Sequence, residues 1–368
     1  MNHGWEKKRL GDVCQINFGK RIVAKDTPPG PYYVYGGGGA TFTTMDYNRE
    51  NCMIVSRFAM SPECVRFVRG RFFLNDSGLS VQSNNGLLTQ EFVEKYLWAI
   101  QPQIYNLGRG AAQKNLNTKS FSEMPIPIPA VEVQRQIVLE LDKINEMLEV
   151  KRGQLKDLDM LSQSLFYEMF GEPIENPQGW ETFHLRDLVK EKLSYGSGAS
   201  GIPYDNKIRY IRITDIDERG NLKPEIASSP SEYNSKYMLK HGDILLARSG
   251  ATVGKAFLYK KSIGPAIYAG YLIKVSIDMS ILNSIYLYEF TKTAYYWNYI
   301  SKSIRGAAQP NVNAQLYGNL SIPVPPLSLQ NEFASKIEAI EEQKRVIEST
   351  ISDLEVLLAS RMDYWFNY

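Results

Sequence analysis

Two glycine-rich segments of this chain contain residues that could hold the phosphates of a nucleotide. Gly196-Ser-Gly-Ala-Ser-Gly201 has the glycine spacing of a dinucleotide-binding turn, and Gly250-Ala-Thr-Val-Gly-Lys255 approximates a phosphate-binding loop. The first has no clear strand before it, and Pro203 stands where the helix should run. The second has one residue too few between its glycines, and Ala256 replaces the hydroxyl that binds magnesium. Neither segment therefore predicts a nucleotide site.

Groupings that could catalyse a reaction or bind a metal do not stand out either. The histidines stand apart from the cysteines, which all lie in the first third of the chain: His3, His184 and His241, and Cys14, Cys52 and Cys64. No Ser/His/Asp arrangement, carboxylate pair or metal-ligand spacing is evident, so we expect neither an enzyme nor a chain with its own cofactor or metal. Unpaired buried thiols are typical of cytosolic proteins. The absence of a leader and of a long apolar run predicts a cytoplasmic protein without a membrane partner.

Basic and amide side chains between short β-type segments offer a different chemistry. Residues 14–108 and 189–304 alternate β-branched runs with Gly, Pro and Asn breaks, and helical patterns near 89–100 and 282–304 close each insert. Lys and Arg pair with phosphates, Arg also with guanine, and Asn with adenine. Any one of these residues could equally be a solvated surface charge. The candidate nucleic-acid contacts are Arg57, Arg69, Arg71 and Asn85 in the first insert, and Arg209, Arg212, Arg248, Thr252 and Lys255 in the second.

A sequence repeat frames these inserts. The turn Arg109-Gly-Ala-Ala-Gln113 recurs 196 residues later as Arg305-Gly-Ala-Ala-Gln309, and each copy is followed by an Ile-Pro-x-Pro string and a glutamine, Gln134 or Gln330. The inserts themselves share little obvious sequence. We expect Arg109, Gln113, Arg305 and Gln309 to organise a junction between a domain and a helix, with a nucleic-acid-facing turn as the open alternative.

Each repeat ends in a long amphipathic segment. After the proline-rich strings, apolar residues spaced alternately four and three apart continue for four to five heptads and predict a coiled-coil helix of about 35 residues, or roughly 50 Å. Because such a helix cannot bury its apolar face alone, we expect the two copies to pair antiparallel about a local two-fold axis. Lys151, Ser162, Lys344 and Arg361 interrupt the seam, where the cations could fix the register or extend to solvent. The predicted seam residues are Ile137, Leu141, Ile144, Leu148, Leu155, Leu158, Ile337, Ile340, Ile347, Ile351, Leu354 and Leu358.

The formal charge of +2 is unevenly distributed. Residues 1–124 hold 15 Lys/Arg against 10 Asp/Glu and residues 171–320 hold 18 against 14, whereas 125–170 hold 5 against 8 and 321–368 hold 4 against 8. Basic inserts on an acidic frame suggest that the inserts meet a polyanion.

The doubled turn, the Ile-Pro-x-Pro strings, the heptad helices and Asn176-Pro-Gln-Gly-Trp-Glu181 resemble the specificity (S) subunit of type I restriction–modification systems. The segment from Asp243 to Lys255 also resembles one common in target recognition domains of that family. The resemblance implies an α+β fold: two mixed α/β target recognition domains, joined by two long antiparallel coiled-coil helices with pseudo-two-fold symmetry. The predicted boundaries are 1–124 and 171–320 for these domains, and 125–170 and 321–368 for the helical regions.

The resemblance further implies that each domain reads one half of a bipartite, asymmetric site in double-stranded DNA while the helices set the spacer. Two methyltransferase (M) subunits would dock on the conserved regions, and restriction (R) subunits can join them. S-adenosylmethionine, ATP and magnesium would then belong to the partners. Two alternatives stay open: a coiled-coil scaffold without DNA specificity, and an enzyme that uses Lys255 on a nucleotide.

Overall fold

The computed structural model describes residues 4–84, 86–110, 113–217, 220–304 and 311–366. The chain divides into two compact units: unit 1 comprises Met1–Gly153 and Ser349–Tyr368, and unit 2 comprises Gln154–Glu348. Two long helices, α5 (Val131–Phe170) and α9 (Leu327–Phe366), each contribute one part to each unit.

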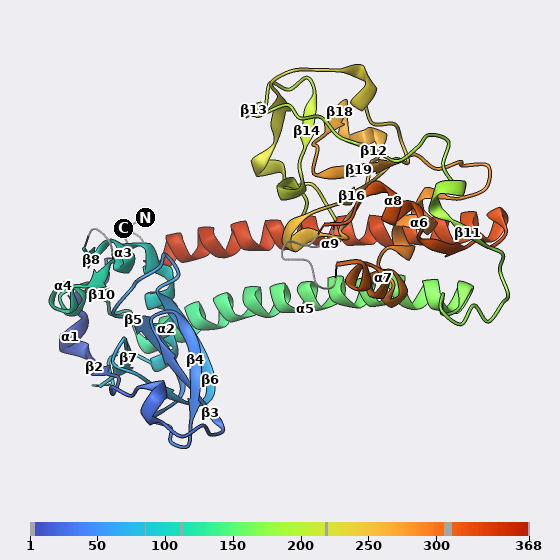
Figure 1. The fold of residues 1–368 in the computed structure, drawn as a ribbon. Helices are drawn as coiled ribbons and strands as arrows, with labels where there is room; N and C mark the ends of the chain where they lie inside the picture. The colour runs from blue at the N-terminus through green and yellow to red at the C-terminus, as the bar shows by residue number, and fades with distance from the viewer. Residues whose placement is uncertain (1–3, 85, 111–112, 218–219, 305–310, 367–368) are drawn as a thin grey trace. The chain divides into compact units, whose positions relative to one another are not determined.

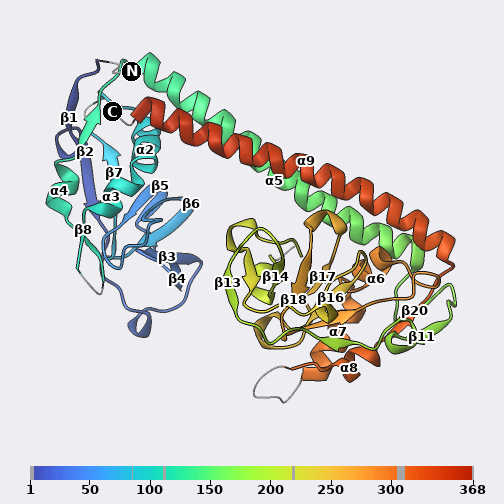
Figure 2. The ribbon, with the colours of Figure 1, turned by 90° about the horizontal axis from the view of Figure 1, so that it is seen from above.

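Helices α5 and α9 are antiparallel within each unit (Figures 1 and 2). In unit 1, Glu140 near the start of α5 contacts Arg361, whereas Arg152 further along α5 contacts the earlier Glu355 at 2.9 Å. In unit 2, Asp159 contacts Lys344 at 2.8 Å, and the later aromatic residues of α5 pack on the earlier Phe333. Each helix has 40 residues, or about 60 Å at 1.5 Å per residue. This is longer than the helix of about 35 residues that the heptad spacing predicted. The antiparallel pairing is confirmed.

The predicted seam residues lie mostly in the core. Leu158, Ile347 and Ile351 are half-buried, and the other nine are buried. The polar residues that interrupt the seam have partners: Ser162 donates to the carbonyl of Leu158 at 3.0 Å, and Lys344 and Arg361 each pair with an acidic residue of α5. These seam cations therefore link the two helices.

Unit 1 contains a six-stranded sheet in the order β2-β7-β5-β6-β3-β4. Helices α2 (Gln90–Ala99) and α3 (Gln101–Asn106) follow the sheet, and the buried face of α2 joins the first part of α5 and the last part of α9 in one apolar core. The strands are β2 (Cys14–Phe18), β3 (Tyr32–Gly36), β4 (Gly39–Thr44), β5 (Arg49–Ser56), β6 (Val65–Leu74) and β7 (Gly78–Ser83).

Unit 2 contains a four-stranded sheet in the order β12-β19-β16-β17. The chain between β12 and β19 also forms two two-stranded pairs, β13–β15 and β14–β18. The aromatic segment predicted as one helical pattern forms two helices, α6 (Ser284–Phe290) and α7 (Ala294–Ile304), and α8 (Ala314–Gly318) follows. The strands are β12 (Ser194–Tyr195), β13 (Gly201–Pro203), β14 (Arg209–Ile211), β15 (Ser228–Pro230), β16 (Ile244–Ala247), β17 (Ala256–Leu258), β18 (Ala266–Tyr268) and β19 (Leu272–Val275).

The two sheets share a four-stranded core. Strands β2-β7-β5-β6 of unit 1 and β12-β19-β16-β17 of unit 2 have the same spatial order, the same chain order and antiparallel pairing throughout. The two inserts share little obvious sequence, yet their backbones have this core in common. The inserts differ in strand length and in what surrounds the core: β6 has 10 residues and β17 has 3.

Each unit also has a short antiparallel ribbon that leads into a long helix. Strand β1 (Lys7–Arg9) pairs with β10 (Pro125–Pro127) before α5, and β11 (Thr182–His184) pairs with β20 (Ser321–Pro323) before α9. The following residue continues both ribbons, because Ile128 N–H donates to Glu6 O at 2.9 Å and Val324 N–H donates to Glu181 O at 2.8 Å. The proline-rich strings thus form one strand of each ribbon, and a long helix begins a few residues after each of them.

Candidate nucleic-acid interface

Arg57 and Arg248 begin the loops that follow strands β5 and β16 of the shared core. The backbone holds both of them: Arg57 N–H donates to Ser77 O at 2.8 Å, and Arg248 N–H donates to Tyr271 O at 3.1 Å. Their carbonyls accept hydrogen bonds at 2.8 Å from Leu116 N–H and Val312 N–H. Each arginine is therefore fixed at its backbone, whereas its side chain extends from the end of a strand.

Both guanidinium groups stack on aromatic rings. Cζ of Arg57 lies 5.0 Å from the centre of the Phe18 ring and 4.6 Å from that of Phe58. Cζ of Arg248 lies 4.7 Å from the centre of the Tyr195 ring. Phe18 and Tyr195 are 48% and 41% exposed, so these pairs reach solvent. A cation over an aromatic face at this distance is held electrostatically while its N–H groups stay available at the edges.

The other arginines predicted in the first insert lie on β6. Arg69 is exposed. Arg71 is also exposed, contacts Glu50 at 3.2 Å and stacks on Tyr47 at 4.7 Å. The hydrogen bond to Glu50 raises the pKa of Arg71, and it occupies part of a guanidinium that would otherwise face an anion. Asn85 lies outside the described residues.

Arg209 and Arg212 are tied into unit 2. Arg209 donates from Nη2 to Lys223 O at 2.9 Å. Arg212 binds the buried carboxylate of Asp215 through Nε at 3.1 Å and Nη2 at 2.9 Å, and Nη2 also donates to Ile226 O at 3.2 Å. These bonds neutralise a buried charge, so Arg212 has a structural role within its domain whether or not it contacts a ligand.

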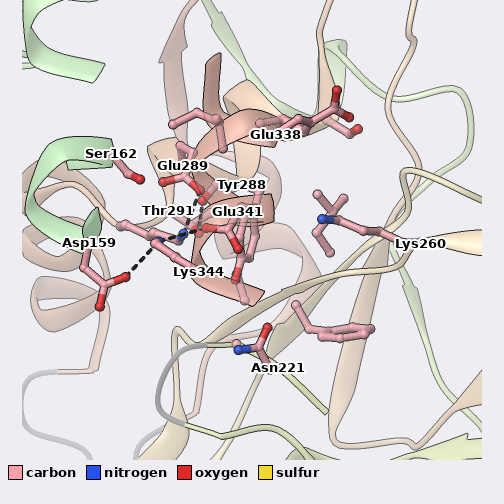
Figure 3. A pocket seen from close by; sticks show the side chains of 18 of the residues that line it. Asp159, Ser162, Asn221, Lys260, Tyr288, Glu289, Thr291, Glu338, Glu341 and Lys344 are labelled. Carbon is pink, nitrogen blue, oxygen red and sulfur yellow. Dashed lines mark hydrogen bonds and ion pairs between the residues drawn. The ribbon is translucent and has the colours of Figure 1, made fainter. Parts of the chain in front are cut away.

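Thr252 and Lys255 follow Arg248 along the chain, but they do not share one environment. Thr252 lies in a single 3₁₀ turn, Gly250–Thr252. Lys255 lines a cavity of about 990 Å³ in unit 2, formed by parts of α5, α9, α6 and β17. Figure 3 shows this cavity, where Lys344 bridges Asp159 and Glu341. Lys255 therefore lines this cavity, whereas Arg248 of the same segment stacks on Tyr195.

The domain–helix junction is held by the glutamines that follow the Ile-Pro-x-Pro strings. The buried side chain of Gln134 accepts from Thr89 N–H at 2.7 Å and donates to Leu87 O at 2.7 Å and Pro129 O at 2.9 Å. Gln330 repeats this arrangement: it accepts from Asn283 N–H at 2.8 Å and donates to Ile281 O at 3.1 Å and Pro325 O at 2.7 Å.

The predicted junction residues Arg109 and Gln113 are exposed and flank the connection between β8 (Gly108–Arg109) and β9 (Asn115–Leu116). This hairpin is bonded to the loop that begins at Arg57, since Met60 N–H donates to Lys114 O at 2.9 Å and Leu116 N–H donates to Arg57 O. Among the described residues, Gln134 bonds the domain to the helix start, and the junction role of Arg109 and Gln113 stays a prediction. Arg305 and Gln309 lie outside the described residues.

Sequence reasoning missed Phe18 and Tyr195. Each is a lone aromatic residue at the end of a short strand, and its arginine partner is distant in sequence, so no local pattern marks it. Gln134 and Gln330 did carry a signal, because they recur at the same place in both repeats.

The cysteines lie within unit 1. Cys14, Cys52 and Cys64 are free and buried, as expected, and burial raises the pKa of each thiol to about 11. In the described part of the chain, no group of His, Cys, Asp and Glu side chains could hold a metal ion. None of the helices described there is long and apolar enough to cross a membrane.

Comparisons with known proteins agree with this architecture. A family model described as the type I restriction modification DNA specificity domain matches residues 2–159 and again residues 177–355. The MjaVIII and MjaIX specificity subunits of type I restriction enzymes from Methanocaldococcus jannaschii are 21% and 22% identical to this chain over 92% of its length, and the matches cover 86% and 87% of those proteins.

Solved structures with the same fold cover the whole chain. The S subunit of a type I restriction–modification system from M. genitalium matches with a TM-score of 0.64 at 16% identity, covering 100% of this chain and 97% of that one. A chain from a study of complex assembly and conformational transition of the type I R-M system matches with a TM-score of 0.57 at 16% identity, covering 99% and 97%. Together with the two family matches, these likenesses confirm the predicted fold class, and the chain belongs to the family of type I restriction–modification DNA specificity subunits.

Proposed function

We propose that each of the two domains reads one half of a bipartite, asymmetric DNA sequence, and that α5 and α9 set the unread spacer between the halves. The shared four-stranded core, which presents Arg57 and Arg248 from equivalent strand ends, supports this proposal most directly. Two related domains on one helical frame suit a site with two separate parts. The two inserts differ in the residues that surround the shared core, so the two halves of the DNA site should differ in sequence.

The charge distribution supports DNA as the ligand of the inserts. Residues 1–124 and 171–320 carry the excess of Lys and Arg, whereas the helical regions are acidic. Phosphates attract the former and repel the latter. The DNA should therefore meet the sheets and their loops, and the helices should remain available to protein partners.

We further propose that two methyltransferase subunits dock on the helices. Several apolar side chains on the helices of unit 1 are exposed by at least 51%, namely Leu139, Met147, Val150 and Val356, and Met160 and Val346 are similarly exposed in unit 2. Exposed apolar side chains on a surface that is otherwise charged suit a protein interface. S-adenosylmethionine would then be bound by the methyltransferase, and ATP and magnesium by a restriction subunit. The complex would work in the cytoplasm.

Binding measured against salt tests the DNA proposal. The chain, purified in complex with its methyltransferase subunits, should bind duplex DNA with an affinity that falls steeply as salt rises, because phosphate contacts release counterions. Weak binding that salt does not change would favour a coiled-coil scaffold without DNA specificity. Nucleotide hydrolysis by the isolated chain would instead favour the enzyme alternative based on Lys255.

A further inference from the structure

The pairs Phe18–Arg57 and Tyr195–Arg248 occupy the same place in the shared core. In unit 1, Phe18 pairs with Leu79, which in turn pairs with Val55, and Arg57 follows two residues later. In unit 2, Tyr195 pairs with Ile273, which pairs with Leu246, and Arg248 again follows two residues later. The strand register thus places an aromatic side chain and an arginine together in both domains.

The backbone contacts of the two arginines are equivalent as well. Each carbonyl accepts a hydrogen bond at 2.8 Å, from Leu116 in one domain and Val312 in the other, and these donors are themselves 196 residues apart, as the repeat requires. The arginines are therefore part of what the two domains have in common, although they lie within inserts that share little obvious sequence. A residue common to both domains cannot account for a difference between the sequences that they read.

The hydrogen-bond donors of the two guanidinium groups also bear on what these arginines contact. Arg57 donates from Nη1 to Asp76 O at 3.3 Å. Nε of Arg248 is buried without a hydrogen-bond partner among the described residues. These contacts engage or bury part of each guanidinium, and the charged N–H groups that remain are enough to bind a phosphate oxygen.

We propose that Arg57 and Arg248 are equivalent contacts to the DNA backbone, one in each domain, and that Phe18 and Tyr195 are positioning residues that hold the guanidinium groups. This proposal rests on the proposed function and assigns a specific role within it. Sequence discrimination would then come from the residues around the shared core.

The test uses the complex with methyltransferase subunits and two duplexes: one with the motif that the wild-type complex methylates, and one with that motif scrambled. Arg248→Ala should weaken binding to both duplexes by the same factor, about tenfold, and reduce the slope of log affinity against log salt by about one. Arg248→Lys should keep the slope. Tyr195→Ala should lower affinity but leave the slope near that of the wild type, because the charge remains. Arg57→Ala repeats the test in the other domain.

Arg186→Ala is the matched control, since Arg186 is an exposed arginine of the same domain that pairs with Asn319 and Asp187. It removes the same charge and should change neither slope nor motif. If Arg248→Ala instead spares the scrambled duplex and relaxes the motif at one base pair, Arg248 reads a base and the inference is wrong. Unchanged affinity for both duplexes would also overturn it. A wild-type complex that binds both duplexes equally would contradict the proposed function itself.

Discussion

At the scale of single residues, Gln134 and Gln330 connect each domain to its long helix. Each side chain satisfies one backbone N–H and two carbonyls that come from two different segments of the chain. Both side chains are fully buried, so removing either amide takes the partner away from three backbone groups inside the protein. The junction should therefore be sensitive to this one side chain.

Gln134→Ala should lower the free energy of unfolding by about 3 kcal/mol, because three buried backbone groups lose their partner. Urea titration of the purified chain measures this change. Gln113→Ala is the matched control: Gln113 is exposed, and its loss should cost less than about 0.5 kcal/mol. A larger loss of stability for Gln113→Ala than for Gln134→Ala would show that the repeated turn, and not Gln134, connects the domain to the helix.

The repeat made Gln134 and Gln330 visible in the sequence but did not reveal their role. The turn between Arg109 and Gln113 repeats just as clearly, and the described part of its hairpin is bonded to the loop at Arg57. Repetition indicates a shared constraint, but only the contacts show which one. The aromatic partners of Arg57 and Arg248 could not be predicted, because strand pairing between distant segments determines them.

At the scale of elements, the helices were the most predictable part of the chain. Heptad spacing is a local signal, and the proline-rich strings marked where each helix begins. Sheet order leaves no such signal. The pairing of β5 with β7 and of β16 with β19 joins segments of unlike sequence and unlike spacing, so the shared core appeared only in three dimensions.

The pair Glu140–Arg361 should make the helix pairing of unit 1 dependent on pH. Hydrogen bonds from Arg361 and then Trp365 lower the pKa of Glu140 against the opposing effect of burial. A carboxylate with a lowered folded-state pKa contributes stability above its unfolded pKa of about 4.3 and loses it as pH falls through the folded value. Glu140→Gln should therefore cost about 1 kcal/mol at neutral pH.

Thermal melts across pH test this prediction. The difference between wild type and Glu140→Gln should shrink as pH falls below about 4.3. Glu149→Gln, which removes a charge from an exposed side chain of the same helix, is the control and should show a smaller difference at neutral pH. A difference for Glu140→Gln that stays constant down to strongly acidic pH would show that charge pairing is not the cause.

The ruler proposal predicts the effect of lengthening α5. Four residues inserted after Gly153 add about one turn, or 6 Å, which corresponds to about two base pairs of duplex. The preferred spacer should change while both half-sites stay the same. The same insertion after Glu175, beyond the end of α5, should leave the spacer unchanged. Methylation motifs of the two variants provide the measurement, and an unchanged spacer in the first variant would refute the ruler.

At the scale of the whole molecule, two copies of one domain core are attached to two copies of one helix, and the copies differ in the inserts around the core. The sequence predicted this organisation from the repeat and the charge distribution. It could not predict the bases that are read, because the type of a side chain alone does not determine its contact and several candidates, such as Arg212, are bound within their own domain.

The most direct test of the central claim is the methylome of a host that carries this chain and its methyltransferase. The account predicts DNA methylation at one bipartite motif, with two different half-sites separated by a spacer of fixed length and any sequence. A single continuous motif, two identical half-sites, or no methylation that depends on this chain would contradict it.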